Sequence, residues 1–174
     1  MASNQNPEED VFTAVRRMIY DAAGKACKTV LPIKHEYYYG KGSAIAICTL
    51  SSIDLLLKIS KTPFIMNKIL IVGRLLSENR GIDAIIRFTI NNPTLRHIVV
   101  CGADVKGHRS GQALLSLYKN GVDRRGRILG STSPSPILSC DIREIELFRS
   151  QTVVHDLTGN KDIDELAASI SNLY

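Results

Sequence analysis

The amino-acid sequence predicts an α/β domain in which helices flank a mostly parallel sheet. The first observation is that strand patterns and helix patterns alternate from Ser43 onward, as they do in repeated strand–helix–strand units. The second is a hydrophobic content of 44%, dominated by leucine, isoleucine and valine, which suits helices packed on a parallel sheet. At 174 residues the chain can bury a substantial core as one domain. We therefore expect a single Rossmann-like domain, preceded by an additional N-terminal helix.

The predicted strands are short apolar runs, and the predicted helices carry apolar residues at helical spacing. We expect strands at 43–50, 68–73, 95–101, 127–130 and 152–156. We expect helices near 51–58, 79–91, 109–120, 141–149 and 162–171. Pro93 ends the second of these helices, because the residue before a proline is disfavoured in helical conformation. Gly121 ends the third through a left-handed cap.

The region before the sheet is predicted to contain one amphipathic helix at 8–24. Its apolar residues recur at helical spacing, and Glu8, Glu9 and Asp10 place negative charge at its start, where the helix dipole favours it. This helix is expected to pack on the domain or to form a dimer contact. Residues 25–42 read as irregular, with three tyrosines at 37–39 that could cover the sheet edge or line a cofactor site. The expected division is an extension at 1–30 and a domain at 31–174.

Composition and charge narrow the classes of partner. Aromatic residues make up 6% of the chain and tryptophan is absent, so the chain lacks the stacking residues of single-strand nucleic-acid binding. The net charge is +5, but the basic residues are dispersed. The densest basic cluster is at 124–127, which reads either as a solvated turn or as a contact for a phosphate or carboxylate.

Cysteine spacing and hydropathy bear on the expected compartment. Four cysteines show no CxxC spacing and read as buried, reduced thiols of a cytosolic protein: Cys27, Cys48, Cys101 and Cys140. No run of about 18 apolar residues is present. The N-terminus also lacks the basic flank and apolar core of a secretory signal. The sequence therefore predicts a cytoplasmic protein with no membrane span in this chain.

The most informative segment follows the strand predicted at 95–101. It places His108 between Gly107 and Gly111, directly before the helix predicted at 109–120. Ligands of open α/β sheets bind where a strand ends and a helix begins, because backbone N–H groups are available there and small residues permit close approach. His108 is therefore a candidate cofactor contact. The alternative is a histidine that only occupies the first helical turn.

The residues from Cys101 to Gly130 closely resemble the corrinoid-carrying subunit of the tetrahydromethanopterin S-methyltransferase of methanogenic archaea. Further similar segments are 31–33, 43–50, 78–82, 92–96, 145–151 and 153–157, so that the resemblance covers roughly residues 31–168. Its most specific element is the run from Lys106 to Gln112, in which the family places its cobalt-ligating histidine.

The resemblance implies a corrinoid cofactor, such as cobalamin, with His108 as the axial cobalt ligand. The function implied is a methyl carrier of methanogenesis, which passes a methyl group from methyl-tetrahydromethanopterin to coenzyme M together with partner methyltransferase subunits. The family's protein ends in a membrane anchor, whereas this sequence stops at Tyr174, so we expect a soluble paralogue or an anchor-less domain. Besides His108, the expected cofactor-binding residues are Asp104, Lys106, Gly107, Ser110, Gly111, Gln112, Gly130, Ser131, Thr132, Ser133 and Pro134.

Two parts of this expected site leave alternatives open. A metal-bound histidine usually donates its second ring N–H to an acceptor, and Asp104 is the nearest carboxylate in sequence. A backbone carbonyl would serve equally, and Asp104 could instead be a solvated loop residue. The hydroxyl and N–H groups of 130–136 could bind the amides or phosphate tail of a corrinoid, or this loop could be a plain strand-to-helix connection. Ser133 and Ser135 replace small residues of the family pattern.

Two other functions fit the predicted fold. A Rossmann-like module for a nucleotide or phosphorylated ligand is supported only by the loops at the sheet edge, since the chain has neither a GxGxxG motif nor a P-loop. A complete enzyme with its own active site is disfavoured. Ser110 and Ser131 lack the context of a nucleophile elbow, and no carboxylate pair is arranged for acid–base chemistry.

Overall fold

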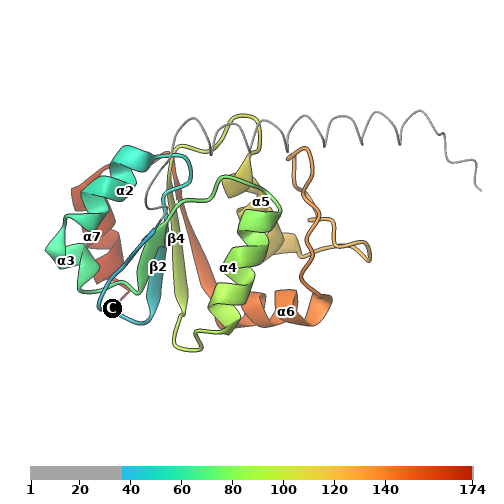
Figure 1. Cartoon of the computed structure of the whole chain (residues 1–174), viewed down its shortest axis with the longest axis horizontal. Coiled ribbons are helices and arrows are strands. Elements are labelled where there is room, and N and C mark those ends of the chain that lie inside the picture. Colours follow the sequence, from blue (N-terminus) through green and yellow to red (C-terminus); the bar gives the residue numbers. More distant parts are fainter. Residues whose placement is uncertain (1–36, 174) are drawn as a thin grey trace, which may run out of the picture. The chain divides into compact units, whose positions relative to one another are not determined.

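The computed structural model describes residues 37–173, which belong to one compact unit, Glu36–Tyr174. A mixed five-stranded sheet forms its centre, and helices cover both faces of the sheet (Figure 1). The unit therefore has the α/β fold that the alternating patterns predict. The helix predicted at 8–24 and the extension predicted at 1–30 lie outside the described residues.

The sheet has the strand order β1-β3-β2-β4-β5. The strands are β1 (Tyr37–Tyr39), β2 (Ile45–Cys48), β3 (Ile71–Gly73), β4 (His97–Gly102) and β5 (Val153–Thr158). Strands β2 to β5 are parallel to one another, and β1 pairs antiparallel with β3. The chain passes from β2 to β3 on one side and then crosses to β4 and β5 on the other. The carboxyl ends of β2 and β4 therefore flank the point where the strand order reverses, which is where open α/β sheets bind ligands.

The helices are α2 (Ile53–Ser60), α3 (Pro63–Met66), α4 (Arg80–Ile90), α5 (Ser110–Asn120), α6 (Ile142–Gln151) and α7 (Ile163–Ser171). Helices α4, α5 and α6 cover one face of the sheet, and α2, α3 and α7 cover the other (Figure 1). None of the helices in residues 37–173 combines the length and the apolar character needed to cross a membrane.

Alternating residues of the central strands supply two apolar cores. Val100 packs with Leu114 and Phe148 on the face covered by α4, α5 and α6. Its neighbour Val99 packs on the opposite face with Leu56 of α2. All four residues of β2 are buried, as expected for a central parallel strand with helices on both sides. The two cores hold the carboxyl ends of the strands in a fixed arrangement.

Three local predictions differ from the structure. The strand predicted at 127–130 is wrong: Arg127 and Ile128 form only isolated bridges, because left-handed turns at Gly126 (φ +75°) and Gly130 (φ +76°) limit the extended run. The region predicted as irregular contains β1, which pairs with β3 at the sheet edge. The short helix α3 was not predicted, and Pro63 occupies its first position, where a missing N–H costs nothing.

Candidate functional site

A histidine–carboxylate pair lies at the carboxyl edge of the parallel strands. The loop after β4 carries His108, and the loop after β3 carries Glu78. The Nδ1 atom of His108 lies 2.8 Å from Oε2 of Glu78. The Glu78 side chain is 4% exposed, whereas that of His108 is 30% exposed. An ionised carboxylate only accepts hydrogen bonds, so Nδ1 carries the proton and the neutral tautomer has its lone pair on Nε2.

Glu78 joins three segments that are far apart in the sequence. Its second carboxylate oxygen, Oε1, accepts a hydrogen bond of 3.0 Å from the backbone N–H of Ser135. The residues around Glu78, His108 and Ser135 are thereby held at one place by a single buried side chain. A buried carboxylate with both oxygens bonded is orientationally fixed, and it fixes the imidazole ring in turn.

Asp104 is not the partner of His108, so the interpretation of Asp104 as the acceptor is wrong. Its carboxylate accepts hydrogen bonds from the backbone N–H groups of Gly111 (2.9 Å) and Gln112 (3.0 Å) at the start of α5. It also accepts one from the N–H of Val105. Helix N-termini leave such N–H groups unpaired and favour negative charge, which explains why the aspartate turns toward the helix. Asp104 therefore fixes the two ends of the loop that carries His108.

The two glycines that flank His108 have different roles. A Cβ atom on Gly111 would lie 2.9 Å from both Cδ atoms of Leu50 and 3.2 Å from Cγ of Asp104. Gly111 thus permits close packing of α5 on the neighbouring loop, and its expected contact with a cofactor stays a prediction. A Cβ atom on Gly107 would meet nothing within 4 Å, so Gly107 faces open space.

The start of α5 is held by backbone geometry and by one buried hydroxyl. Arg109, which precedes the helix, has a left-handed backbone conformation (φ +47°). A non-glycine residue in this region is uncommon and persists only where its surroundings impose it. Ser110 is fully buried, and its hydroxyl donates to the carbonyl of Leu75 (2.8 Å) in the loop after β3. Ser110 therefore supports the loop rather than facing a ligand.

The loop at 130–134 lies beside the His108 loop and is joined to it by hydrogen bonds. Gln112 Nε2 donates to the carbonyl of Gly130 (3.1 Å), and its Oε1 accepts from the backbone N–H of Thr132 (3.0 Å). Arg109 Nη1 donates to Oγ1 of Thr132 (3.0 Å), and the buried Ser133 hydroxyl donates to the carbonyl of Arg109 (3.0 Å). These bonds use Gln112 and Ser133 as internal ties between the two loops.

The remaining predicted residues lie at the surface of the same region. Lys106, Thr132 and Pro134 are exposed, and Ser131 is partly exposed and accepts a hydrogen bond from the backbone N–H of Ser133. The structure therefore separates side chains that build the loops from side chains that face solvent near His108. Cofactor contacts from this region are expected from the exposed group and from backbone atoms.

The predicted site residues do not include Glu78, which appears in the sequence only within a segment that resembles the family. A signal was available, because Glu78 follows a parallel strand at the same sheet edge as His108. Within residues 37–173 no group of three or more histidine, cysteine or acidic side chains is placed to hold a metal ion. A single imidazole with a fixed tautomer suits an ion whose other ligands come from a cofactor.

The three cysteines in the described part of the chain are free thiols, in agreement with the predicted reduced state. Burial raises the pKa of Cys48 and Cys101 to about 12. Burial, together with a hydrogen bond and the charge of Asp83, raises the pKa of Cys140 to about 12. With these raised pKa values the thiols are protonated at neutral pH, and they pack as small apolar groups in the core.

His97 and His155 form a second histidine pair away from this site. They lie on β4 and β5, and Nδ1 of His97 is 3.2 Å from Nε2 of His155. Both side chains are partly buried. Burial and, secondarily, the neighbouring His97 lower the pKa of His155.

The fold and this site define an α/β protein with a buried carboxylate that orients a histidine at the sheet edge. The family model for the A subunit of tetrahydromethanopterin S-methyltransferase matches residues 25–174, and the chain belongs to this family. It is 44% identical over 102 residues to the second form of that A subunit from Methanothermobacter thermautotrophicus, a match that covers 58% of this chain and 56% of the relative. It is 34% identical over 136 residues to the A subunit of the putative methyltransferase Mtx of Methanosarcina barkeri, a match that covers 77% of this chain and 64% of the relative. The chain thus spans less than two thirds of the length of either relative.

Proposed function

We propose that this chain is a corrinoid-binding methyl carrier of a methyltransferase system, with His108 as the axial ligand of cobalt. The observation that carries the proposal is the 2.8 Å bond between Nδ1 of His108 and the buried carboxylate of Glu78. A second hydrogen bond that fixes the tautomer and ring orientation is the usual arrangement around a metal-ligating histidine. The parallel strand order and the helices on both faces support the description of the domain as Rossmann-like.

The residues present fit a corrinoid. His108 would hold the cobalt ion as a neutral imidazole, and a proton on Nδ1 leaves the lone pair on Nε2 for that bond. Gly107 leaves open space next to the histidine, which a flat macrocycle requires. The loop from Gly130 to Pro134 lies beside the His108 loop, and its exposed residues Thr132 and Pro134 could contact the periphery of the cofactor.

The cofactor, when bound, supplies a cobalt ion that can take up and give away a methyl group. The chain's own residues hold the site for that chemistry. Glu78 keeps the proton of His108 on Nδ1, Asp104 fixes both ends of the histidine loop, and Gln112 ties this loop to residues 130–132. The names of the relatives point to methyl-tetrahydromethanopterin as the donor of the methyl group. The family resemblance points to coenzyme M as the acceptor. Partner subunits would perform the two half-reactions.

The start of α5 argues against the alternative of a nucleotide or phosphorylated ligand. Such ligands bind to the unpaired N–H groups at a helix N-terminus. Here the carboxylate of Asp104 already accepts from the N–H groups of Gly111 and Gln112. A phosphate would have to displace a negatively charged group from its own capping position, so we favour the corrinoid.

Reconstitution tests the proposal directly. The full chain is refolded with hydroxocobalamin and desalted, and the visible absorbance that remains with the protein is measured. We expect one corrinoid to remain bound per protein chain. The matched variant Glu146→Gln, on α6, should retain the same amount of corrinoid as the native chain. Colourless protein under several refolding conditions contradicts the proposal. Ultraviolet absorbance of a co-purifying nucleotide would favour the alternative.

A further inference from the structure

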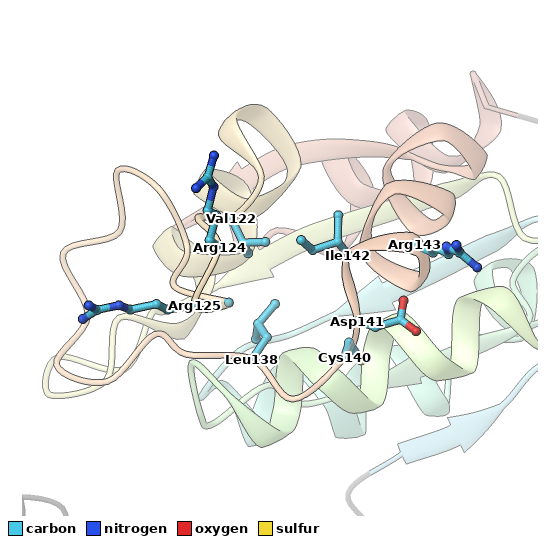
Figure 2. A pocket seen from close by; sticks show the side chains of 9 residues that line it. Val122, Arg124, Arg125, Leu138, Cys140, Asp141, Ile142 and Arg143 are labelled. Atoms are coloured by element: carbon cyan, nitrogen blue, oxygen red, sulfur yellow. The ribbon is translucent and has the colours of Figure 1, made fainter.

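A surface hollow of about 510 Å³ lies between the turn at 122–126 and the start of α6. Its centre is apolar, and its charged lining residues are Arg124, Arg125, Asp141 and Arg143. Figure 2 shows the side chains of Val122 and Ile142 pointing toward each other above Leu138. The side chains of Arg124 and Arg143 extend outward on opposite sides of this apolar centre (Figure 2). An apolar centre with arginine at its margin is the usual composition of a protein interface.

One of the apolar side chains that line this hollow is strongly exposed to solvent. Ile142 at the start of α6 is 55% exposed. The apolar side chains beside it are less exposed, since Val122 is partly buried and Leu138 is buried. Ile142 is therefore the apolar side chain of the hollow that is most available to a partner.

The charged side chains that line the hollow are mostly basic, since Arg124, Arg125 and Arg143 stand against Asp141. In the described part of the chain the side chains of Arg124 and Arg143 have no hydrogen bond or ion pair. The neighbouring carboxylates are engaged with backbone groups. Asp123 accepts from the N–H groups of Arg125 and Arg127, and Asp141 accepts from the N–H of Glu144 as the cap of α6. The rim therefore offers positive charge to an external group.

The hollow is held in place by a buried contact with α4. The carboxylate of Asp83 accepts hydrogen bonds from the backbone N–H groups of Ser139 and Cys140 and from the Ser139 hydroxyl (2.8 Å). This anchors the segment that carries Leu138 directly before α6. A surface that is already ordered loses less conformational entropy when it binds a partner.

We infer that this surface binds an acidic segment of a partner protein, which places an apolar side chain between Val122 and Ile142 and carboxylates near Arg124 and Arg143. An extended segment is favoured over a small anion because the arginines point away from the centre, on opposite sides of it. The inference goes beyond the proposed function and does not depend on it, since the surface shares no residue with the His108 site.

The test uses the full chain and a short, fluorescein-labelled peptide of alternating glutamate and leucine, followed by fluorescence anisotropy. We expect saturable binding that weakens as sodium chloride rises from about 50 to 300 mM. The double variant Arg124→Glu/Arg143→Glu should bind the peptide about tenfold or more weakly. The matched control Lys58→Glu/Lys61→Glu has the same change in charge on the α2 and α3 side of the molecule and should bind as the native chain does.

Several outcomes would overturn the inference. One is equal binding by the native chain and the Arg124→Glu/Arg143→Glu variant. Another is equal binding of a glutamate–serine peptide, which would show that the apolar centre is not used. Binding of inorganic phosphate or of anionic lipid vesicles in place of the peptide would assign the surface to another ligand. Self-association abolished by the same variant would assign it to a second copy of the chain. Corrinoid absorbance of the variant, measured in parallel, separates these outcomes from a failure of the proposed function.

Discussion

Replacing Glu78 by glutamine tests how the chain prepares His108 for cobalt. The change keeps the size of the side chain but replaces one carboxylate oxygen by an NH₂ group. The native carboxylate accepts two hydrogen bonds, one from Nδ1 of His108 and one from the N–H of Ser135. The single oxygen of glutamine can accept only one of these two hydrogen bonds in the same geometry. The NH₂ group must then face either the N–H of Ser135 or the imidazole of His108. We expect the imidazole to move its proton from Nδ1 to Nε2.

The magnitude follows from the lost hydrogen bond. A hydrogen bond to a charged group contributes about 1.5 to 3 kcal/mol. Because the Glu78 side chain is 4% exposed, water does not readily replace the lost partner. The preference for the Nδ1–H tautomer should therefore fall roughly 10- to 150-fold in Glu78→Gln. That range agrees with the roughly 10- to 100-fold loss of metal affinity that follows removal of a ligand's hydrogen-bond partner.

The assay is a long-range proton–nitrogen correlation spectrum of the chain labelled with nitrogen-15 histidine, recorded without cofactor at neutral pH. It distinguishes the two neutral tautomers of each imidazole. The native His108 should carry its proton on Nδ1, and Glu78→Gln should abolish that pattern. Glu146→Gln removes an exposed carboxylate that pairs with Arg149 and should leave it unchanged. An Nε2–H tautomer in the native chain, or identical spectra for Glu78→Gln and the native chain, would refute the reasoning.

Two further predictions concern the scaffold. Gly111→Ala should lower the free energy of unfolding by about 1 to 3 kcal/mol, because its Cβ atom would lie 2.9 Å from Leu50. Gly107→Ala should change it by less than about 0.5 kcal/mol, and urea denaturation compares the two. In the folded chain, burial and then the neighbouring His97 lower the pKa of His155 below its ordinary value of 6.5. As the pH falls below 6.5, His155 therefore takes up a proton more readily in the unfolded chain than in the folded chain. The native chain should therefore lose stability below pH 6.5, and His155→Gln should show a smaller loss in the same titration; an unchanged slope would contradict this.

The regular elements were predictable because each has a local signal. The strand expected at 95–101 is His97–Gly102, and the helix expected at 109–120 is Ser110–Asn120. The strand expected at 127–130 was not predictable from its apolar residues alone. Its length is set by the left-handed turns at Gly126 and Gly130, and its partners lie in two different segments. A short apolar run cannot show by itself whether a ladder forms.

The site was predictable where its parts are adjacent in sequence. His108, Gly107 and the start of α5 follow from the loop itself. The hydrogen-bond partner of His108 was not predictable from the sequence. Glu78 lies 30 residues earlier in the chain and is close to His108 only because of the order of the strands in the sheet. Asp104 is closer in sequence, yet the unpaired N–H groups at the start of α5 attract its carboxylate. Of the alternatives that the sequence left open, neither Asp104 nor a backbone carbonyl of the described residues pairs with Nδ1 of His108, which bonds to Glu78.

The most direct test of the account is electron paramagnetic resonance of the corrinoid-loaded chain in the cobalt(II) state, with nitrogen-15 histidine. The unpaired electron couples to an axial nitrogen, so labelling changes the splitting only if a protein imidazole is the ligand. We predict that the native chain and His97→Ala show the labelled splitting and that His108→Ala loses it while remaining folded. A labelled splitting that survives in His108→Ala, or none in the native chain, would contradict the assignment of His108 as the cobalt ligand.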